Sequence, residues 1–454
     1  MRRMREQVGL LTLIAIFPLA CSPLNQETPR RMKPRQNQAT ATGWHAEGTH
    51  GAVSGGGAEA VEAGMLILKN GGNAADAAVA TILALSVTDA DRFSFGGEVP
   101  IMAYNAAQAV TEVIAGQGVA PRLATQEYFA SKGSIPTKGI EVAAVPAVLD
   151  ACLVTLERHG TQRFGEVALP TLVLLERNEQ AWHSRLRTTL LELIDVESRS
   201  KDRSAGLKRV ADHFYRGPIA HRIDAWSRAH GGLLRYEDLA AQGTRVEKPV
   251  ETEFRGYTIQ KCGPWTQGPS LLQALQILEP AEMLKHGPDE PETIHTIAET
   301  IKLALADRDQ YYADPLFADV PLRQLLDPEY AAIRRTLIDP DHSSLELRPG
   351  DPQTRTAVVP VRPRIQTPAY KPTDTTTCLV ADRWGNVVAA TPKWLGRRTF
   401  TRYRDLARIP TAEFSDRPQP PECHHAWQTP TNYPKPNTRS QGRQTRAGSQ
   451  RGRR

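Results

Sequence analysis

Three consecutive hydroxyl side chains, Thr375, Thr376 and Thr377, follow Asp374 and could do nucleophilic chemistry. A threonine hydroxyl is a weak nucleophile unless a base lies beside it. Cleavage of the chain immediately before a threonine would supply that base, because the new α-amino group titrates near neutrality. One residue would then hold both the nucleophile and the proton acceptor. The alternative is ordinary strand chemistry, since threonine is common in β-strands, and the residues alone leave both interpretations open.

The sequence gives less support to nucleotide-binding, serine-hydrolase and zinc motifs than to the threonine segment. Ser54-Gly55-Gly56-Gly57 precedes a helical pattern but lacks the Walker lysine and the spaced dinucleotide fingerprint, which favours a tight strand-to-helix turn. The sequence has no GxSxG serine motif. His295 and Glu299 lie four residues apart on an expected helix without a second histidine. We therefore expect a surface contact between these two side chains and not a zinc site.

The cysteines give no metal pattern. Cys152, Cys262, Cys378 and Cys423 are far apart, with no CxxC pair and no Cys/His spacing suited to zinc. Cys152 lies in an apolar helical run, which predicts a buried thiol. We expect no bound metal. The sequence leaves open whether two of these cysteines form a structural disulfide.

The candidate nucleophile begins a predicted β-hairpin. Residues 375–382 carry β-branched side chains on both faces, residues 382–386 supply turn chemistry, and residues 387–391 form a return strand. Such a hairpin is expected near the centre of a sheet. Helical stretches precede it, and helices followed by strands argue for a layered α/β architecture.

Several helices and one further strand must position this hairpin. Gly71 and Gly72 end the first helix and Asn73 caps the second. Residues 172–210 are helical in pattern without a defined packing, and residues 100–104 form a short strand. Apolar periodicity predicts helices over residues 57–70, 74–86, 147–159, 269–278 and 292–312.

The N-terminus has the features of an export signal. Arginines precede an apolar run over residues 8–20 that is too short to span a bilayer, so we assign residues 1–20 as a signal peptide and residues 21–49 as a polar linker. Cys21 follows Ala20, which leaves two interpretations: lipidation of Cys21 with membrane anchoring, or an ordinary secretory signal cut after Ala20. Either way we expect an exported protein, in the periplasm or anchored to the membrane of a bacterium.

The net charge of +6 over 454 residues is unevenly distributed. Residues 395–454 carry a net +9 and the rest of the chain −3. The basic balance is therefore not evidence for a nucleic-acid partner. Residues 394–454 are rich in proline, arginine and glutamine without a regular apolar pattern, which predicts a disordered basic tail.

Residues 375–391, TTTCLVADRWGNVVAAT, resemble the start of the small subunit in the gamma-glutamyltranspeptidase family. The resemblance extends in order over roughly residues 50–391. Its further segments are residues 62–78, 94–98, 231–239, 254–257, 268–273 and 303–309.

The resemblance implies an N-terminal-nucleophile hydrolase with a four-layer αββα sandwich, incomplete at the C-terminus. It implies self-cleavage between Asp374 and Thr375, which separates a large-subunit-like region (50–374) from the start of a small subunit (375–393), and the two fragments stay associated. Thr375 would attack a γ-glutamyl or related acyl amide of the glutathione class, with no cofactor. Thr376 and Asn386 would be structural neighbours of the nucleophile.

Three departures from the family pattern stand out. Gln117 occupies the position of an arginine that holds the substrate's α-carboxylate by a charge-assisted contact. Lys393 occupies the position where the family has a hydroxyl residue that supports the nucleophile. The family's later small-subunit motifs, including its Ser-Ser oxyanion site, find no match. The change after about residue 392 suggests a reading-frame shift, and the alternative is a genuine basic tail that contacts anionic lipid or polymer. The alternative to an active transferase, or to an acylase-like branch, is an inactive remnant or a non-catalytic exported binding lipoprotein.

Overall fold

A computed structural model describes residues 47–136, 139–177, 180–361 and 375–393. The predicted signal peptide and nearly all of the linker, Cys21, Asp374 and the basic tail lie outside these residues. The description below concerns the unit that begins at His50. In this part of the chain no helix combines the length and the apolar character needed to cross a bilayer.

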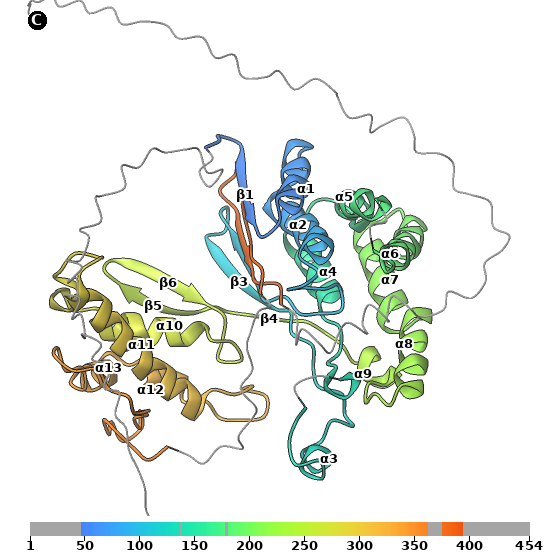
Figure 1. Ribbon diagram of the computed structural model, residues 1–454. Coiled ribbons are helices and arrows are strands. Elements are labelled where there is room, and N and C mark those ends of the chain that lie inside the picture. The colour runs from blue at the N-terminus through green and yellow to red at the C-terminus, as the bar shows by residue number, and fades with distance from the viewer. Residues whose placement is uncertain (1–46, 137–138, 178–179, 362–374, 394–454) are drawn as a thin grey trace, which may run out of the picture. The chain divides into compact units, whose positions relative to one another are not determined.

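Six antiparallel strands form the central sheet, in the order β1-β7-β8-β2-β3-β4 (Figure 1). The predicted hairpin, β7 and β8, occupies the middle of this sheet, although its first strand begins at Cys378 and not at Thr375. The α/β fold class and the central hairpin are thus confirmed. The strands are β1 (Gly51–Gly55), β2 (Ile101–Asn105), β3 (Val110–Ala115), β4 (Arg245–Glu247), β7 (Cys378–Asp382) and β8 (Val387–Ala390).

The hairpin turn is built by Asp382. Its Oδ1 accepts the backbone N–H groups of Trp384 (2.9 Å) and Asn386 (3.0 Å), and Gly385 adopts a φ of 85° that favours glycine. Its Oδ2 accepts the N–H of Ala74, the first residue of α2 (Ala74–Thr88), at 2.9 Å. One carboxylate therefore closes the turn and fixes the hairpin to a helix 308 residues earlier in the chain.

Helices α1 (Ala58–Lys69) and α2 cover one face of the sheet (Figure 1). The predicted caps are confirmed: Gly71 has a φ of 91°, and Asn73 Oδ1 accepts the N–H groups of Ala75 (2.9 Å) and Asp76 (3.1 Å). Nearly every residue of α2 is buried, because the alanine-rich helix lies between the sheet and α5. The predicted Gly-rich segment before α1 is a strand-to-helix turn.

The region predicted to be helical over residues 172–210 forms the end of α5, α6 and the first part of α7. Buried Cys152 of α4 confirms the predicted buried thiol. These helices and their neighbours are α3 (Gln126–Ala130), α4 (Val148–His159), α5 (Phe164–Glu176), α6 (His183–Ser198), α7 (Arg203–Tyr215), α8 (Pro218–Ala229) and α9 (Tyr236–Ala240), with a short 3₁₀ helix at Ile140–Val142.

A second hairpin packs with the remaining helices around a buried ion pair. Asp307 and Arg334 are both fully buried, with Arg334 Nε 3.1 Å from Asp307 Oδ2. Gln273 donates to the same carboxylate at 2.6 Å and Tyr330 at 3.0 Å. The elements are β5 (Val250–Phe254), β6 (Tyr257–Lys261), α10 (Gly268–Leu278), α11 (Pro291–Tyr311), α12 (Leu322–Leu325) and α13 (Pro328–Arg335), with a short 3₁₀ helix at Ala281–Leu284.

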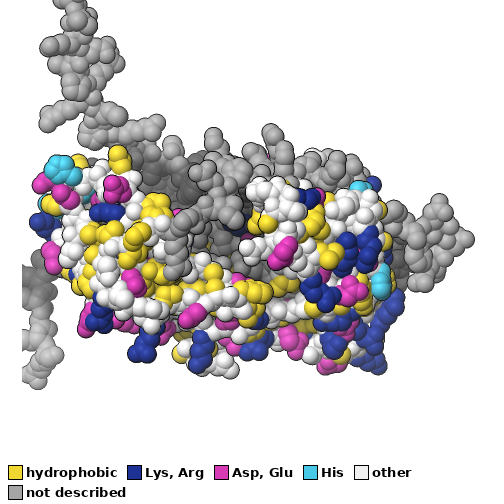
Figure 2. Space-filling view, turned by 90° about the horizontal axis from the view of Figure 1, so that it is seen from below, with side chains coloured by type: hydrophobic (Ala, Val, Ile, Leu, Met, Phe, Trp, Pro, Cys, Tyr) yellow, Lys and Arg dark blue, Asp and Glu magenta, His cyan; other side chains and the backbone are white. Residues whose placement is uncertain are grey.

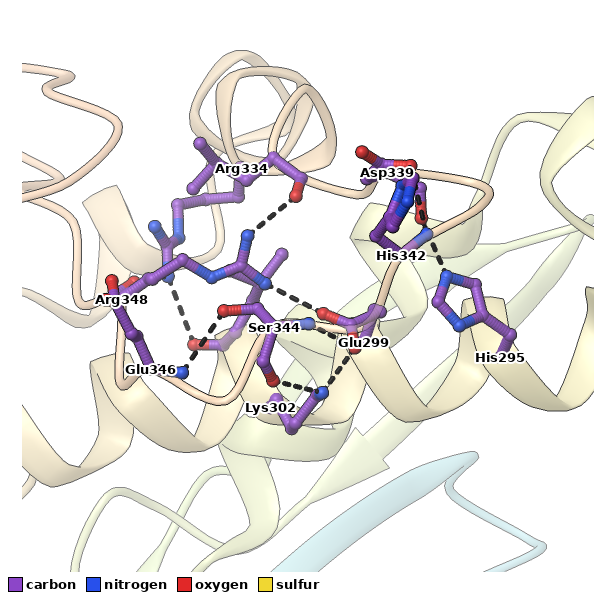
Figure 3. A network of polar contacts seen from close by, with 11 residues as sticks. His295, Glu299, Lys302, Arg334, Asp339, His342, Ser344, Glu346 and Arg348 are labelled. Atoms are coloured by element: carbon purple, nitrogen blue, oxygen red, sulfur yellow. Dashed lines mark hydrogen bonds and ion pairs between the residues drawn. The ribbon is translucent and has the colours of Figure 1, made fainter.

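The prediction that His295 and Glu299 contact each other at the surface is wrong (Figure 3). Glu299 is buried, pairs with Lys302, and accepts from Arg348 Nη2 at 2.8 Å. His295 Nε2 instead donates to the backbone carbonyl of Asp339 at 2.7 Å. Asp339 and Arg348 both belong to the loop after α13. His295 and Glu299, which contact them, therefore hold that loop against α11.

Candidate active site

Thr375 lies three residues before β7 and forms an antiparallel bridge with Lys393. Thr376 N donates to Pro392 O at 3.1 Å, so Thr375 and Lys393 face each other in a pair without mutual backbone hydrogen bonds. On the other side, Lys393 and Glu98 exchange backbone hydrogen bonds of 2.9 and 3.2 Å. Thr375, Lys393 and Glu98 therefore form one cross-strand row, with Thr375 exposed at its end.

The residue next to the candidate nucleophile is anchored in the core. Thr376 is buried and its Oγ1 donates to Asp89 Oδ2 at 2.6 Å. Asp89 is the C-cap residue of α2. A Cβ atom on Gly56 would lie 2.1 Å from Asp89 Oδ2 and 2.2 Å from Thr376 Oγ1, so only glycine leaves room for this contact. Asp89 was not predicted from the sequence, because no local spacing connects it to a threonine 287 residues later.

Thr375 opens into a cavity of about 630 Å³, the size of a small-molecule site. The cavity brings together the row just described, Gln117, the loop after β6 and the end of α11. Its lining residues are Glu98, Pro100, Gln117, Lys261, Cys262, Pro264, Trp265, Thr266, Gln267, Gly268, Arg308, Asp309, Tyr312, Ala313, Asp314, Thr375, Thr391 and Lys393.

The predicted residues Gln117 and Thr375 thus share one cavity, while Asp374 and Cys21 lie outside the described residues. Asn386, expected near the nucleophile, is instead in the hairpin turn at the opposite end of β8, where its Oδ1 accepts the N–H of Ala106 at 3.0 Å. Its resemblance-based role as a neighbour of Thr375 is therefore wrong. Hairpin geometry explains the difference, because the turn and the open ends lie a full strand length apart.

A cysteine, Cys262, also lines the cavity. Burial raises the pKa of its thiol to about 11, against the smaller opposing effect of Lys261. At neutral pH this cysteine is a thiol and a poor nucleophile. The cysteines of the described residues are all free, and no group of His, Cys, Asp or Glu side chains there could hold a metal ion. The hydroxyl of Thr375 lies in this cavity beside polar and charged groups, together with the hydroxyls of Thr266, Thr391 and Tyr312.

An α/β fold with an antiparallel central sheet, covered by helices and carrying a threonine at the open end of a central strand, fits the N-terminal-nucleophile hydrolases. The family model for Gamma-glutamyltranspeptidase matches residues 60–178 and 202–393. The chain belongs to the gamma-glutamyltranspeptidase family.

Two bacterial proteins are similar to this chain. The chain is 30% identical to the Glutathione hydrolase proenzyme of Bacillus subtilis (strain 168) over 73% of this chain and 62% of the relative. It is 30% identical to the Acylase ACY 1 proenzyme of Pseudomonas sp. (strain SE83) over 79% of this chain and 68% of the relative. The chain thus spans about three fifths of the length of the glutathione hydrolase.

Solved structures agree on the fold. The structure of LmbA2991HD superposes with a TM-score of 0.67 at 32% identity, covering 77% of this chain and 69% of that one. The gamma-glutamyltranspeptidase from Pseudomonas nitroreducens complexed with L-DON gives a TM-score of 0.56 at 26% identity, covering 67% of this chain and 99% of that one. Sequence and structure therefore agree on the family and on the fold.

Proposed function

We propose that this protein is a threonine-dependent acyl-transfer enzyme that cleaves itself before Thr375 and then transfers or hydrolyses a γ-glutamyl or related acyl group. The observation that carries the proposal is the position of Thr375, exposed in a cavity of about 630 Å³ and held by the buried hydrogen bond of its neighbour Thr376 to Asp89. Two relatives of this chain are named as proenzymes, which supports activation by cleavage.

Self-cleavage needs the same hydroxyl as catalysis. Thr375 Oγ1 would attack the carbonyl carbon of Asp374, and the peptide C–N bond would break to leave an ester and a free α-amino group. Water would then hydrolyse that ester and release the carboxyl group of Asp374. The product is a chain that begins at Thr375, whose amine can accept the hydroxyl proton in the next reaction.

In the catalytic cycle, Thr375 Oγ1 would attack the substrate amide carbonyl while its own amine takes the hydroxyl proton. The amide C–N bond would break, the leaving amine would receive that proton, and the acyl group would remain on Thr375 as an ester. Water or the amine of an acceptor would then attack this ester. The chain's similarity to both a glutathione hydrolase and an acylase supports the reaction type and leaves the acyl group to be measured.

The test is hydrolysis of a chromogenic amide, L-glutamic acid γ-(4-nitroanilide), by purified protein. We expect Thr375→Ala to lower the rate by a factor on the order of 10³ or more. Thr377→Ala is the matched control, because Thr377 is an exposed threonine of the same segment that does not line the cavity. Turnover that survives Thr375→Ala would contradict the proposal, and a wild-type protein without turnover would favour the non-catalytic alternative.

Export and anchoring belong to the same proposal. Residues 1–20 would direct the chain out of the cytoplasm, and Cys21 would carry a lipid if the lipoprotein interpretation holds. After cleavage the two fragments would stay associated, because β7 and β8 pair with β1 and β2 in the middle of the sheet.

A further inference from the structure

Lys393 is the cross-strand partner of the candidate nucleophile. In an antiparallel pair, directly opposite side chains leave the same face of the sheet with Cβ atoms about 4.5–5.5 Å apart, and they are closer in pairs without mutual backbone hydrogen bonds. Thr375 and Lys393 form such a pair, and both line the cavity. Two backbone hydrogen bonds with Glu98 hold the backbone of Lys393. The Lys393 carbonyl oxygen also packs so closely on Gly97 that a Cβ there would lie 2.5 Å from it.

The charge of Lys393 is not used elsewhere in the described part of the protein. There, the ammonium group has no hydrogen-bond or ion-pair partner, although the side chain is half-buried. Arg308, another cation of the cavity, is already occupied: its Nε donates to Asp309 Oδ1 at 2.9 Å and its Nη1 to Gln267 Oε1 at 2.7 Å. A lysine beside the reaction centre is therefore available for an anionic ligand.

Gln117 cannot provide that charge. Its amide lines the same cavity but offers only neutral hydrogen bonds. Three carboxylates also line the wall, and one of them, Asp309, already accepts from Arg308 Nε. Glu98 lies one pair further from Thr375 than Lys393 does, and Asp314 accepts the backbone N–H of Leu316 at 2.9 Å. The charge nearest to the nucleophile along the row is thus positive.

We propose that Lys393 determines substrate specificity by holding a free carboxylate of the acyl donor a few bonds from the amide carbonyl attacked by Thr375. The proposal rests on the proposed function, because it takes Thr375 as the reacting group. The ligand class is an amide of an amino acid or dicarboxylic acid. A lysine is a flexible point charge without the two-pronged geometry of arginine. We therefore expect carboxylates at neighbouring positions of the donor to be accepted with similar affinity.

The test compares two probes: L-glutamic acid γ-(4-nitroanilide) and its α-carboxamide counterpart, which lacks the carboxylate charge. Dissociation constants are measured by calorimetry on the full chain, with KM added where turnover occurs. We expect the wild type to prefer the carboxylate probe by roughly tenfold to a hundredfold, as for a hydrogen bond to a charged group. Lys393→Met should reduce this ratio to about one, and Lys393→Arg should keep it.

Two further variants separate charge recognition from folding. Lys69→Met is the control, since Lys69 is an exposed lysine in the last turn of α1 and should leave the ratio unchanged. Adding Gln117→Arg to Lys393→Met should restore part of the preference, because it returns a cation to the cavity.

The proposal is overturned if Lys393→Met keeps the preference, or if the wild type shows no preference or binds neither probe. Denaturing gels of the same samples report chain cleavage. A chain that stays uncut yet shows the Lys393-dependent preference would contradict the proposed function alone.

Discussion

At the residue scale, the buried contact between Thr376 and Asp89 holds the candidate nucleophile in its place. The hydrogen bond of 2.6 Å joins the residue after Thr375 to the end of α2, and Gly56 leaves the space that it needs. The orientation of Thr375 therefore depends on a side chain that does not itself line the cavity.

Replacing Thr376 by valine tests this contact. Thr376→Val keeps the volume but leaves Oδ2 of the buried Asp89 carboxylate without its donor. We expect this loss to cost about 1.5–3 kcal/mol in the free energy of unfolding. Urea unfolding followed by circular dichroism measures the loss. Thr377→Val, at an exposed position, should change the free energy by less than about 0.5 kcal/mol. Equal effects of the two variants would mean that the contact is not stabilising.

At the scale of elements, the loop over residues 339–348 is held against α11 by Glu299 (Figure 3). Burial alone would raise the pKa of Glu299. The hydrogen bond and charge of Lys302, with the N–H of Ser344 and the charge of Arg348, outweigh burial and keep this pKa below the ordinary value of 4.5. The ionised carboxylate is therefore stabilised by folding.

Glu299→Gln should lower the free energy of unfolding at pH 7 by about 1.5–3 kcal/mol. Because the folded-state pKa is depressed, this contribution is complete above the ordinary pKa and is lost as the pH falls through the folded-state value. The difference between wild type and variant should thus shrink below about pH 4.5. Urea titrations at pH 7, 5.5 and 4 measure it, with exposed Glu292→Gln as the control. A difference that grows on acidification would contradict this account.

Local signals in the sequence predicted the local structure well. The Asn73 cap, Gly71 and the turn at residues 382–386 depend on neighbours in the chain, and all are confirmed. The contacts that were missed or mistaken join distant segments. Asp89 meets Thr376 across 287 residues, and Glu299 meets Arg348 across 49. No spacing rule encodes such contacts, since they depend on how the elements pack.

At the scale of the whole molecule, the positive charge is concentrated outside the part of the chain that forms the cavity. On the face shown in Figure 2, lysines and arginines are interspersed with aspartates and glutamates and do not form a field of one sign. The residues before 395 carry a net −3. The overall net charge of +6 therefore comes from the final sixty residues, and the part of the chain that forms the cavity does not contribute a positive net charge.

Cellular fractionation tests the anchoring hypothesis. If Cys21 is lipidated, the wild-type protein expressed in a bacterium should sediment with membranes, and Cys21→Ala should move it to a soluble or unprocessed fraction. Cys152→Ala is the control cysteine, because Cys152 is buried in α4 and is no modification site. A wild-type protein that is soluble in the periplasm would exclude the lipid anchor and leave the ordinary secretory signal.

The most direct test of the central claim is the start of the smaller fragment after purification. Denaturing gels with intact-mass and N-terminal sequencing should give two fragments from the wild type, the smaller beginning at Thr375. Thr375→Ala should remain a single chain, and Thr377→Ala should be cut like the wild type. A wild-type chain that stays uncut, or a fragment that begins at another residue, would contradict the assignment of Thr375 as the nucleophile.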